Sequence, residues 1–503
     1  MARSITPVAM NAAAASPPEL AAQLAAGESA MSAGRHQDAA RAFETVSDLL
    51  PQDLGVARLA AAAWQLAGRR ARARAVLQRS LAVANLAATT DTVAYELAAL
   101  CLDVGAPAEA LTLLEVVART RPGHPAMLGA MASAHRALGA LDQAWRLAEQ
   151  AVAKDRKNPA LLLTAAQVRH AQLRFDEALA WLKKAEAVRP LHGPTRMQRA
   201  LTRLIQGPTR HGWEDFEHRG VPPLSSGCSW WRGEALAGRS IRVLMEQGVG
   251  DLFHFVRFVP LLAERGAGEV VLEAPESTLS LLQASGLPAF APGAGPATEL
   301  AVPLLSLPLR LGTEGETLAG RVPYLRTSLN DAPHKTSGEP RPAENRPLRL
   351  GLIPSGNPDF LATNLRDLDQ PALAALLELP DVQWTWLLPD KPPIAGFSLA
   401  VPQLSYNWLD TALLMSQLDG VVSVDTGGAH LAGALGLPTL VLLPYTPDWR
   451  WGPSGERSAW YPSMRLLRES TPASWPAVVA RVPELLALWR RETLFAYGPT
   501  TGR

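Results

Sequence analysis

The sequence predicts a multidomain chain in which an all-α solenoid of helical repeats is followed by an α/β module of two lobes. Three observations lead to this fold class: a period near 34 residues in the first third, strand-like runs alternating with helical segments in the rest, and a length of 503 residues. One hydrophobic core stops growing beyond about 250–300 residues, so two or three domains are expected.

Alanines and the glycines before them mark the repeat period. Five alanines lie 34, 37, 34 and 34 residues apart, a glycine stands five positions before each of the first four, and Leu173 fills the fifth slot. The alanines are Ala39, Ala73, Ala110, Ala144 and Ala178, and the glycines are Gly34, Gly68, Gly105 and Gly139. Prolines at 51, 122 and 190 close the first, third and fifth units. A small residue lets two helices approach, a glycine permits the turn, and a proline ends the second helix.

This pattern resembles the tetratricopeptide (TPR) repeat, which has two antiparallel helices per unit. Arrays of such repeats form concave surfaces that hold another protein. The first third of the chain is therefore interpreted as a docking device, with a polypeptide acceptor or partner protein on its concave face. Any chemistry must then lie downstream.

Composition excludes several classes of function. The net charge of +1 gives no electrostatic footprint for nucleic acid. No apolar run approaches the roughly 18 residues that a membrane span needs. The N-terminal stretch is interpreted as a disordered leader, with a secretory signal as the alternative. Cys101 and Cys228 lie too far apart in the sequence to form a disulfide framework or a zinc site, which suits a cytoplasmic protein.

Downstream of residue 240 the pattern changes to strand, glycine turn and helix. Apolar runs rich in β-branched residues alternate with helical segments, as in parallel sheets covered by helices. The expected strands are 241–245, 269–274, 301–305, 348–354, 382–389, 420–425, 439–445 and 464–469. Two such series imply two Rossmann-like lobes that face a cleft, with ligands beyond the carboxyl ends of the strands.

The resulting domain boundaries follow composition as well as pattern. Residues 211–220 (HGWEDFEHRG) are interpreted as a cap on the last repeat, and residues 327–347 as a polar, proline-rich linker. The predicted parts are a leader (1–18), the TPR array (19–192), a helical cap and connection (193–234), the N-terminal lobe (235–326), the linker (327–347), the C-terminal lobe (348–490) and a tail (491–503).

The strongest candidate site is SVDTGGAHLAGALGLP at 423–438. An apolar strand ends at Asp425, a Thr-Gly-Gly turn follows, and His430 begins a helix. Small residues let backbone N–H groups approach a ligand, and a helix N-terminus favours an anion such as a diphosphate. Such turns also occur wherever a strand leads into a helix, so Asp425 and Thr426 have helix capping as an equal alternative.

A second glycine turn, EQGVGDLFHFVRFVP at 246–260, follows the first strand of the first lobe. Gly248 and Gly250 free the turn, and Asp251 stands where a base would face the cleft, although a capping aspartate is the simpler interpretation. His254 is expected to pack beneath the helix or support it.

A long loop at 444–468 carries Trp449, Trp451, Trp460 and Tyr461. Aromatic rings of this kind can stack on a nucleobase or a sugar. The alternative, that they pack the loop onto its lobe, is favoured.

Together these segments resemble one family, the bacterial TPR-fused glycosyltransferases whose catalytic part is similar to the ADP-heptose:LPS heptosyltransferases. The resemblance covers roughly residues 211–490. Its marks are GWEDFEHR (212–219), WRGEALAGRSIRVLMEQGVGD (231–251), VPLLSLPLRLGT (302–313), SVDTGGAHLAGALG (423–436), LLPYTPDWRWG (442–452) and WYPSMRLLR (460–468). It implies a GT-B fold and an inverting, metal-independent transfer from a nucleotide sugar, with no other cofactor.

The resemblance also implies roles for particular residues. Asp251 would be the catalytic base on the acceptor side, within a loop that includes Gln247, Gly248 and Gly250. The donor would be bound mainly by the C-terminal lobe. Its expected ligands are Asp425, Thr426, Gly427, Gly428, His430, Asn357 and Arg366.

One segment departs from the family pattern. SGNPDFLATNLRDLD (355–369) keeps Asn357 and Pro358, but Asp359 and the two residues after it replace the expected cations. A diphosphate carries about two negative charges and binds poorly in a low-dielectric cleft without a matching cation. Only Arg366 remains nearby in the sequence. Either the donor is bound differently, or the module no longer catalyses.

The leading hypothesis is a cytoplasmic protein glycosyltransferase whose repeats capture the acceptor. Its rival is a non-catalytic TPR scaffold or binding protein with a degenerate transferase module. A small-molecule or lipid-linked acceptor is a weaker option, because it gives the repeats no role. Arg366 or Arg450 pointing into the cleft beside Asp425 and His430 would favour the enzyme, whereas an apolar or acid-lined cleft would favour the scaffold.

Overall fold

The computed structural model describes residues 18–86, 89–224, 227–313, 319–328, 346–361, 363–388, 391, 393, 400 and 407–491. The predicted leader, most of the linker and most of the tail lie outside these residues. The chain forms two compact units. The first contains residues up to Gln172 together with Asn357–Leu365, and the second contains Leu173–Gly356 and the chain from Arg366 onward.

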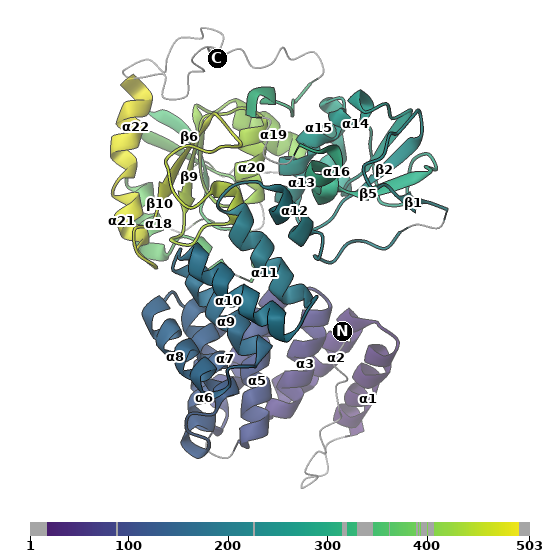
Figure 1. Cartoon of the computed structure of the whole chain (residues 1–503). Coiled ribbons are helices and arrows are strands. Elements are labelled where there is room, and N and C mark those ends of the chain that lie inside the picture. The colour runs from purple at the N-terminus through teal and green to yellow at the C-terminus, as the bar shows by residue number, and fades with distance from the viewer. Residues whose placement is uncertain are drawn as a thin grey trace. The chain divides into compact units, whose positions relative to one another are not determined.

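The first unit is built from consecutive helices that pack each on the next, as the purple and blue helices in Figure 1 show. They are α1 (Pro18–Ser32), α2 (His36–Leu49), α3 (Leu54–Leu66), α4 (Arg70–Val83), α5 (Asp91–Val104), α6 (Pro107–Thr120), α7 (Pro125–Ala137), α8 (Leu141–Lys154) and α9 (Pro159–Ala171). The helix-pair architecture predicted from the repeat period is confirmed.

The phased alanines are the contact points within this architecture. Each of the five marker alanines, Ala39, Ala73, Ala110, Ala144 and Ala178, has an exposed fraction of 0%. The residue four positions after each is buried as well, from Phe43 in α2 to Leu182 in the second unit. The repeated positions therefore form the buried face of the second helix in each pair, as an apolar stripe at helical spacing requires.

The turns within the pairs explain the glycines. Gly34, Gly68, Gly105 and Gly139 all have positive φ angles, between 71° and 80°. Side chains with a Cβ rarely adopt this left-handed conformation, whereas glycine enters it without strain. Leu173 takes the same turn with φ 60°, so the fifth unit keeps the geometry in spite of its side chain.

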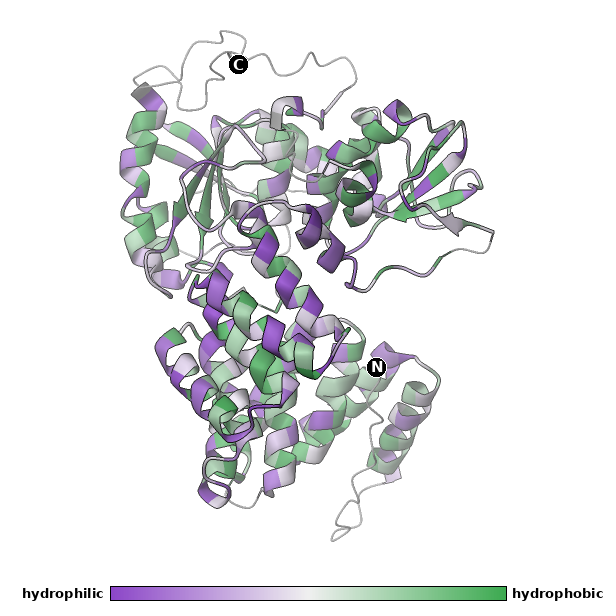
Figure 2. Cartoon of the chain, in the orientation of Figure 1, coloured by the Kyte–Doolittle hydropathy of each residue, from purple (hydrophilic) through white to green (hydrophobic). Residues whose placement is uncertain are grey.

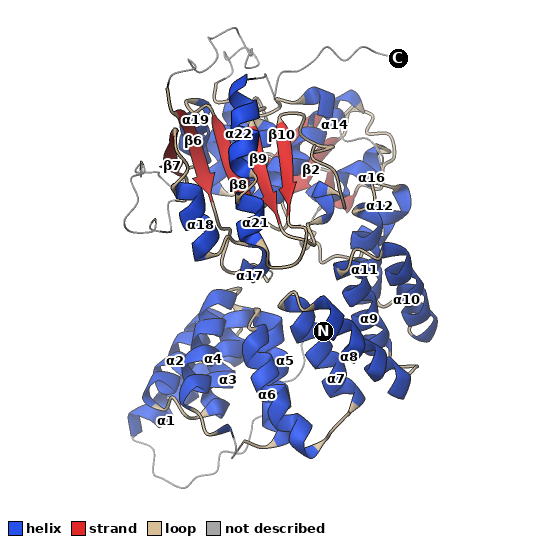
Figure 3. Ribbon diagram, turned by 90° about the vertical axis from the view of Figure 1, so that its left-hand side faces the viewer, coloured by secondary structure: helices blue, strands red, loops and turns tan. Residues whose placement is uncertain are grey.

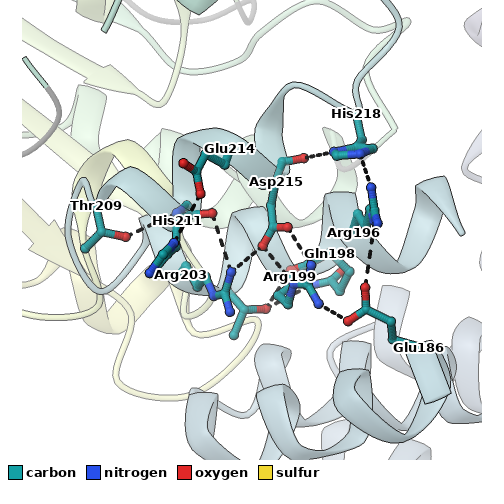
Figure 4. A network of polar contacts seen from close by, with 12 residues as sticks. Glu186, Arg196, Gln198, Arg199, Arg203, Thr209, His211, Glu214, Asp215 and His218 are labelled. Carbon is teal, nitrogen blue, oxygen red and sulfur yellow. Dashed lines mark hydrogen bonds and ion pairs between the residues drawn. The ribbon is translucent and has the colours of Figure 1, made fainter. Parts of the chain in front are cut away.

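The second unit begins with α10 (Phe175–Val188), α11 (Gly193–Leu204) and α12 (Arg210–Phe216). A network of charged side chains joins these helices (Figure 4). The buried carboxylate of Asp215 accepts hydrogen bonds from Arg199 at 2.6 and 2.8 Å and from Arg203 at 2.6 Å, and Arg199 also pairs with Glu186. The paired arginines neutralise a carboxylate that would otherwise be costly to bury.

The segment interpreted as a cap has a further role in the structure. Trp213 and Phe216 of α12 are each 1% exposed and belong to the hydrophobic core of the α/β module. The Trp213 ring meets the Trp449 ring edge-on, with centroids 5.4 Å apart. Residues 210–216 therefore anchor α10 and α11 to the α/β module, because two large aromatic side chains gain most when they are buried there.

Two parallel five-stranded sheets form the rest of the second unit. The first has the order β1-β5-β2-β3-β4 and the second β10-β9-β8-β6-β7. The strands are β1 (Ser229–Trp230), β2 (Ser240–Leu244), β3 (Glu269–Glu273), β4 (Ala289–Phe290), β5 (Leu300–Pro303), β6 (Leu348–Ile353), β7 (Val382–Trp386), β8 (Gly420–Val424), β9 (Thr439–Leu443) and β10 (Met464–Arg468). All the predicted strands are present, and the predicted α/β module is confirmed.

Helices and short 3₁₀ turns connect these strands. In the first lobe they are α13 (Val249–Phe255), η2 (Val256–Phe258), α14 (Pro260–Glu264), α15 (Glu276–Ala284), η3 (Leu304–Ser306), α16 (Leu307–Leu311) and η4 (Ala319–Arg321). In the second they are α17 (Thr363–Arg366), α18 (Gln370–Leu377), α19 (Trp408–Ser416), α20 (Gly427–Ala434), η5 (Trp449–Trp451), α21 (Trp475–Val479) and α22 (Val482–Arg491).

The strands of the second sheet are largely hydrophobic, as their green colour in Figure 2 shows. Its face toward α18, α21 and α22, which lie in front of the sheet in Figure 3, forms one core cluster with those helices. Side chains of α19 and α20 belong to the other cluster, which continues into the first lobe. Parallel strands buried in this way have near-continuous hydrophobic runs, and residues 439–443 (TLVLL) are fully buried.

Candidate active site

Two glycine turns meet at the carboxyl ends of the sheets. One joins β2 to α13 and the other joins β8 to α20, and the two helices pack against each other. Gly250 and Gly427 form the contact: a Cβ on Gly250 would lie 3.2 Å from the Cα of Gly427. The sequence predicted both turns, and the structure brings their main chains together beside the side chains of Val249 and His430.

The first turn positions Asp251. Gln247 has a φ of 60°, and Gly248 donates its backbone N–H to Asp251 Oδ2 at 3.1 Å. Asp251 therefore satisfies a backbone donor at the start of α13 from the third helical position, whereas the N-cap itself is Gly248 and not the aspartate. Its other oxygen forms an ion pair with Arg450. Burial raises the pKa of this carboxyl, and Arg450 opposes the rise.

The second turn begins α20. Thr426 is its N-cap, and the hydroxyl accepts the backbone N–H of Ala429 at 3.3 Å. The capping interpretation of Thr426 is thus correct. A Cβ on Gly428 would lie 2.4 Å from Ile353 Cδ1. Gly428 therefore lacks a side chain because Ile353 of the core occupies the space that a Cβ would need.

Arg450 is the cation at this site. Its side chain is 9% exposed and pairs with Asp251 and also with Asp448, the latter at 2.8 Å. The N-cap of η5 is Asp448, whose carboxylate also accepts the Arg450 backbone N–H at 3.0 Å. A guanidinium keeps its charge under all ordinary conditions and has five donors in a planar fork.

Asp425, the last residue before the turn, is close to the histidine of α20. Its Oδ1 is 3.9 Å from His430 Nε2. Burial, with the charge of Asp448, raises the pKa of Asp425 to about 6, against the attraction of Arg366 and Arg450. Both cations that the sequence singled out thus act on the Asp425 carboxyl.

A tyrosine links two buried histidines. The Tyr461 hydroxyl lies 2.9 Å from His430 Nδ1 and 3.0 Å from His254 Nδ1. Burial lowers the pKa of both histidines well below the ordinary value and raises that of Tyr461 well above it. All three groups are therefore neutral near pH 7, and the Tyr461 hydroxyl, which can both donate and accept, bridges the two rings.

Arg257 completes the buried polar core between the lobes. It is 1% exposed and donates to the His254 carbonyl at 2.8 Å, the Trp460 carbonyl at 2.9 Å and the Tyr324 hydroxyl at 2.8 Å. Sequence analysis did not single it out. A signal was present, since Arg257 is the one cation within the apolar run 252–262.

Glu246 is the first residue of the glycine-turn motif at 246–260, and the sequence alone predicted no role for it. Its carboxylate accepts two hydrogen bonds from Arg219, at 2.6 and 2.8 Å, and one from the backbone N–H of Leu305 at 3.0 Å. Both side chains are 3% exposed. A bidentate buried pair of this kind fixes geometry, so GWEDFEHR (212–219) holds the end of β2 through its final arginine.

The aromatic residues of the long loop are packed inside the module. Trp449, Trp451, Trp460 and Tyr461 are all 5% exposed or less and belong to the main core cluster. Trp451 stacks on the His430 ring with centroids 5.1 Å apart and planes 14° apart. The favoured interpretation, packing of the loop onto the lobe, is confirmed, and so is the packing of His254.

The remaining predicted site residues lie at the end of β6. Arg366 belongs to the second unit, and its guanidinium lies where a Cβ on Gly356 would be. Asn357 belongs to the first unit, and its side-chain oxygen accepts the Asp359 backbone N–H at 2.9 Å. The structure thus groups Arg366 with Asp251, Gly250, Asp425 and His430, and groups Asn357 with the helical repeats.

Within the described part of the chain, no three His, Cys, Asp or Glu side chains are arranged to hold a metal ion. No helix in the described ranges combines the length and the apolar character that a membrane crossing requires.

A family model for glycosyltransferase family 9 (heptosyltransferase) matches residues 406–466. The segment contains the turn into α20, the cation Arg450 and the tyrosine that links the histidines. The resemblance indicated by the motifs is confirmed for this segment, which is similar to glycosyltransferase family 9. No curated protein matches the chain.

Solved structures align with the helical repeats. MamA, at 26% identity, covers 34% of this chain and 99% of its own with a TM-score of 0.26. YrrB, described as a TPR protein with an unusual peptide-binding site, has 14% identity, covers 34% and 88%, and has a TM-score of 0.27. A tetratricopeptide repeat protein from Parabacteroides merdae has 13% identity, covers 39% and 84%, and has a TM-score of 0.30. These likenesses carry no functional argument.

Proposed function

We propose that this chain is a protein glycosyltransferase. The second unit would take a sugar from a nucleotide-sugar donor, and the helical repeats would hold the polypeptide acceptor. Transfer would be inverting and would need neither a metal ion nor another cofactor. The proposal places the reaction in the cytoplasm, since two unpaired cysteines suit a reducing compartment.

The observation that carries this proposal is the position of Arg450. Residues 359–361 lack the cations that a diphosphate needs, and Arg450 supplies one from a different loop. It lies beside Asp251 and close enough to Asp425 and His430 to shift the pKa of both. A guanidinium facing the N-terminus of α20 offers a diphosphate charge and directed hydrogen bonds together.

The chemistry would follow from this arrangement. As the oxygen of an acceptor Ser or Thr attacks the anomeric carbon, its proton passes to Asp251, whose burial makes the carboxyl more basic. The bond from that carbon to the diphosphate breaks on the opposite face. The departing nucleoside diphosphate would be stabilised by Arg450 and by backbone N–H groups at the start of α20.

The scaffold alternative has its own support. Both oxygens of Asp251 already have partners, Gly248 N–H and Arg450, and Asn357 belongs to the other compact unit. A module that had lost catalysis would keep such contacts for stability alone. The scaffold then predicts no donor binding.

The decisive experiment is calorimetric titration of the full-length protein with UDP-, GDP-, ADP- and CMP-sugars. One donor should bind, and Arg450→Gln should weaken it by about tenfold or more, because a charged hydrogen bond is worth about 1.5–3 kcal/mol. Arg481→Gln is the matched control, since that arginine is half exposed and pairs only weakly with Glu456 in the same lobe. Absence of binding to all four donors, with a folded protein, would exclude the enzyme.

A further inference from the structure

Residues Asn357–Leu361 are grouped with the helical repeats, although the residues before and after this stretch belong to the second unit. The second unit contains the chain from Leu173 to Gly356 and again from Arg366, whereas residues 357–365 belong to the compact unit of the helical repeats. This is the segment in which an aspartate and two apolar residues replace the expected cations.

Asp359 is seated on the N-terminus of α4. Its Oδ1 accepts the backbone N–H of Ala71 at 2.8 Å, and its other oxygen lies 4.0 Å from Arg69 Nη1. The Asp359 carboxylate is only 20% exposed there. This is the contact that an N-cap side chain makes, supplied from nearly 290 residues away.

Helix α4 has no cap or acidic residue of its own. Its N-cap is Arg69, whose side chain makes no capping hydrogen bond, and its first turn holds no Asp or Glu. The second helices of the other repeats all carry an acidic first-turn residue, such as Asp38 in α2 and Asp142 in α8. Residues 69–74 (RRARAR) instead add four arginines to the positive end of the helix.

A second contact joins the segment to the repeats. Arg74 Nη2 donates to the Pro358 carbonyl at 2.5 Å, while Nη1 of the same guanidinium donates to the Val104 carbonyl at 2.8 Å. Arg74 thereby ties the segment to the end of α5. The following turn is close as well, because a Cβ on Gly105 would lie 3.0 Å from the Leu361 carbonyl oxygen.

We propose that Asn357–Leu361 is an intramolecular docking segment, and that the arginine-rich N-terminus of α4 with Arg74 is its binding surface on the repeats. The occupant is the chain's own aspartate. The surface binds a carboxylate and a neighbouring main-chain carbonyl. The carboxylate of Asp359 accepts the Ala71 N–H, and the Pro358 carbonyl accepts a hydrogen bond from Arg74. The repeats thereby hold residues 357–361 in place.

Hydrogen–deuterium exchange on the full-length protein tests this proposal. In the wild type, backbone amides of 357–361 and of the first turn of α4 should be protected. Asp359→Ala should speed exchange in both segments by about fivefold, the factor that corresponds to a lost cap of about 1 kcal/mol. Asp359→Asn keeps an acceptor oxygen, so its two segments should lose less protection from exchange than those of Asp359→Ala. Asp38→Ala, in an exposed pair on α2, is the control and should change neither segment.

Arg74→Ala approaches the same contact from the other side. Arg74→Ala should also speed exchange of residues 357–361. In the double variant with Asp359→Ala, the loss of protection should be smaller than the sum of the two single losses, because both substitutions remove one shared contact. Circular dichroism tests whether each variant is folded. If an alanine variant is not folded, the milder Asp359→Asn variant is measured in its place. Fast exchange of 357–361 in the wild type, or unchanged exchange in both single variants, would overturn the proposal.

Discussion

Arg450 is held by two carboxylates, Asp251 from the first lobe and Asp448 from its own loop. The three residues leave one negative charge, and a fourth group, Asp425, lies close by with a pKa of about 6. A diphosphate entering this cluster would therefore compete with carboxylates for the guanidinium. Protonation of Asp425 would remove one of the negative charges around Arg450.

Replacing Asp251 tests general-base catalysis. Asp251→Asn keeps the oxygen that accepts the Gly248 N–H but removes the base, so transfer to the acceptor should fall by about 10²–10⁴-fold with donor affinity nearly intact. Mass spectrometry of the acceptor and calorimetry with the donor measure the two effects. Asp448→Asn is the control, because Asp448 also pairs with Arg450 but is not the proposed base.

In the scaffold alternative the wild type transfers nothing, and Asp251→Asn complements a deletion strain fully. Full complementation together with unmodified acceptors in the wild type would reject the enzyme.

Replacing Asp425 gives a prediction about pH. The pKa is raised in the fold from 3.8 to about 6, so the folded protein holds a proton that the unfolded chain has lost, and stability falls as the pH rises through this window. Asp425→Asn should therefore raise the Tm above pH 6, and its advantage should shrink as the pH falls from about 6 toward 4. Calorimetric scans at several pH values measure this, and an advantage that does not change with pH would contradict it.

At the scale of elements, the site depends on the close approach of α13 and α20. Gly250 and Gly427 let the two helix starts touch, since the nearest neighbours of either Cβ position are main-chain atoms or the side chains of His430 and Val249. Gly428 has another reason to lack a side chain, because Ile353 fills the space. An acidic substitution at Gly428 would therefore disturb the core and would not measure donor binding.

Gly250→Ala tests the helix contact. The new methyl would lie 3.2 Å from Gly427 Cα and from the His430 ring, closer than ordinary contact, so α13 and α20 must separate. Donor binding should weaken by about tenfold or more, since small displacements of a preorganised site are costly. Gly220→Ala is the matched control, because nothing lies within 4 Å of its Cβ position. Equal affinity in the two variants would show that the approach is not required.

At the scale of the whole molecule, the chain divides into two compact units. It passes from one unit to the other after Gln172, before Asn357 and after Leu365. The first unit contains the buried alanines from Ala39 to Ala144 and the docking surface on α4, and the second unit contains Ala178 and the charged cluster. Damage to one unit should therefore have a different consequence from damage to the other.

Ala144→Leu tests this division. Ala144 is fully buried in α8, and three extra heavy atoms in a packed interior typically destabilise by about 1–3 kcal/mol. We expect an earlier unfolding transition of the repeats and loss of transfer to the polypeptide, with unchanged donor affinity. Gln150→Leu adds the same side chain on the exposed face of α8 and is the control. Loss of donor binding in Ala144→Leu alone would contradict the division.

The repeat period and the strand pattern could be predicted because both follow from local periodicity. Buried alanines recur at helical spacing, glycines occupy left-handed turns, and the longer strands are apolar runs between turn residues. The strands that escaped prediction, β1 and β4, have two residues each and are too short to carry a pattern. The candidate turns at 248–251 and 425–430 were found for the same reason, since a glycine turn between strand and helix is a local feature.

The sequence by itself therefore determined the helical array, the α/β module and the two glycine turns, all of which depend on residues close together in the chain. Tertiary structure alone decided that Arg450 pairs with Asp251, 199 residues away, that Tyr461 links His254 and His430, and that Asp359 caps α4. Charge pairing and capping act through space. A lone arginine or aspartate in a loop carries no mark of the partner that burial selects for it.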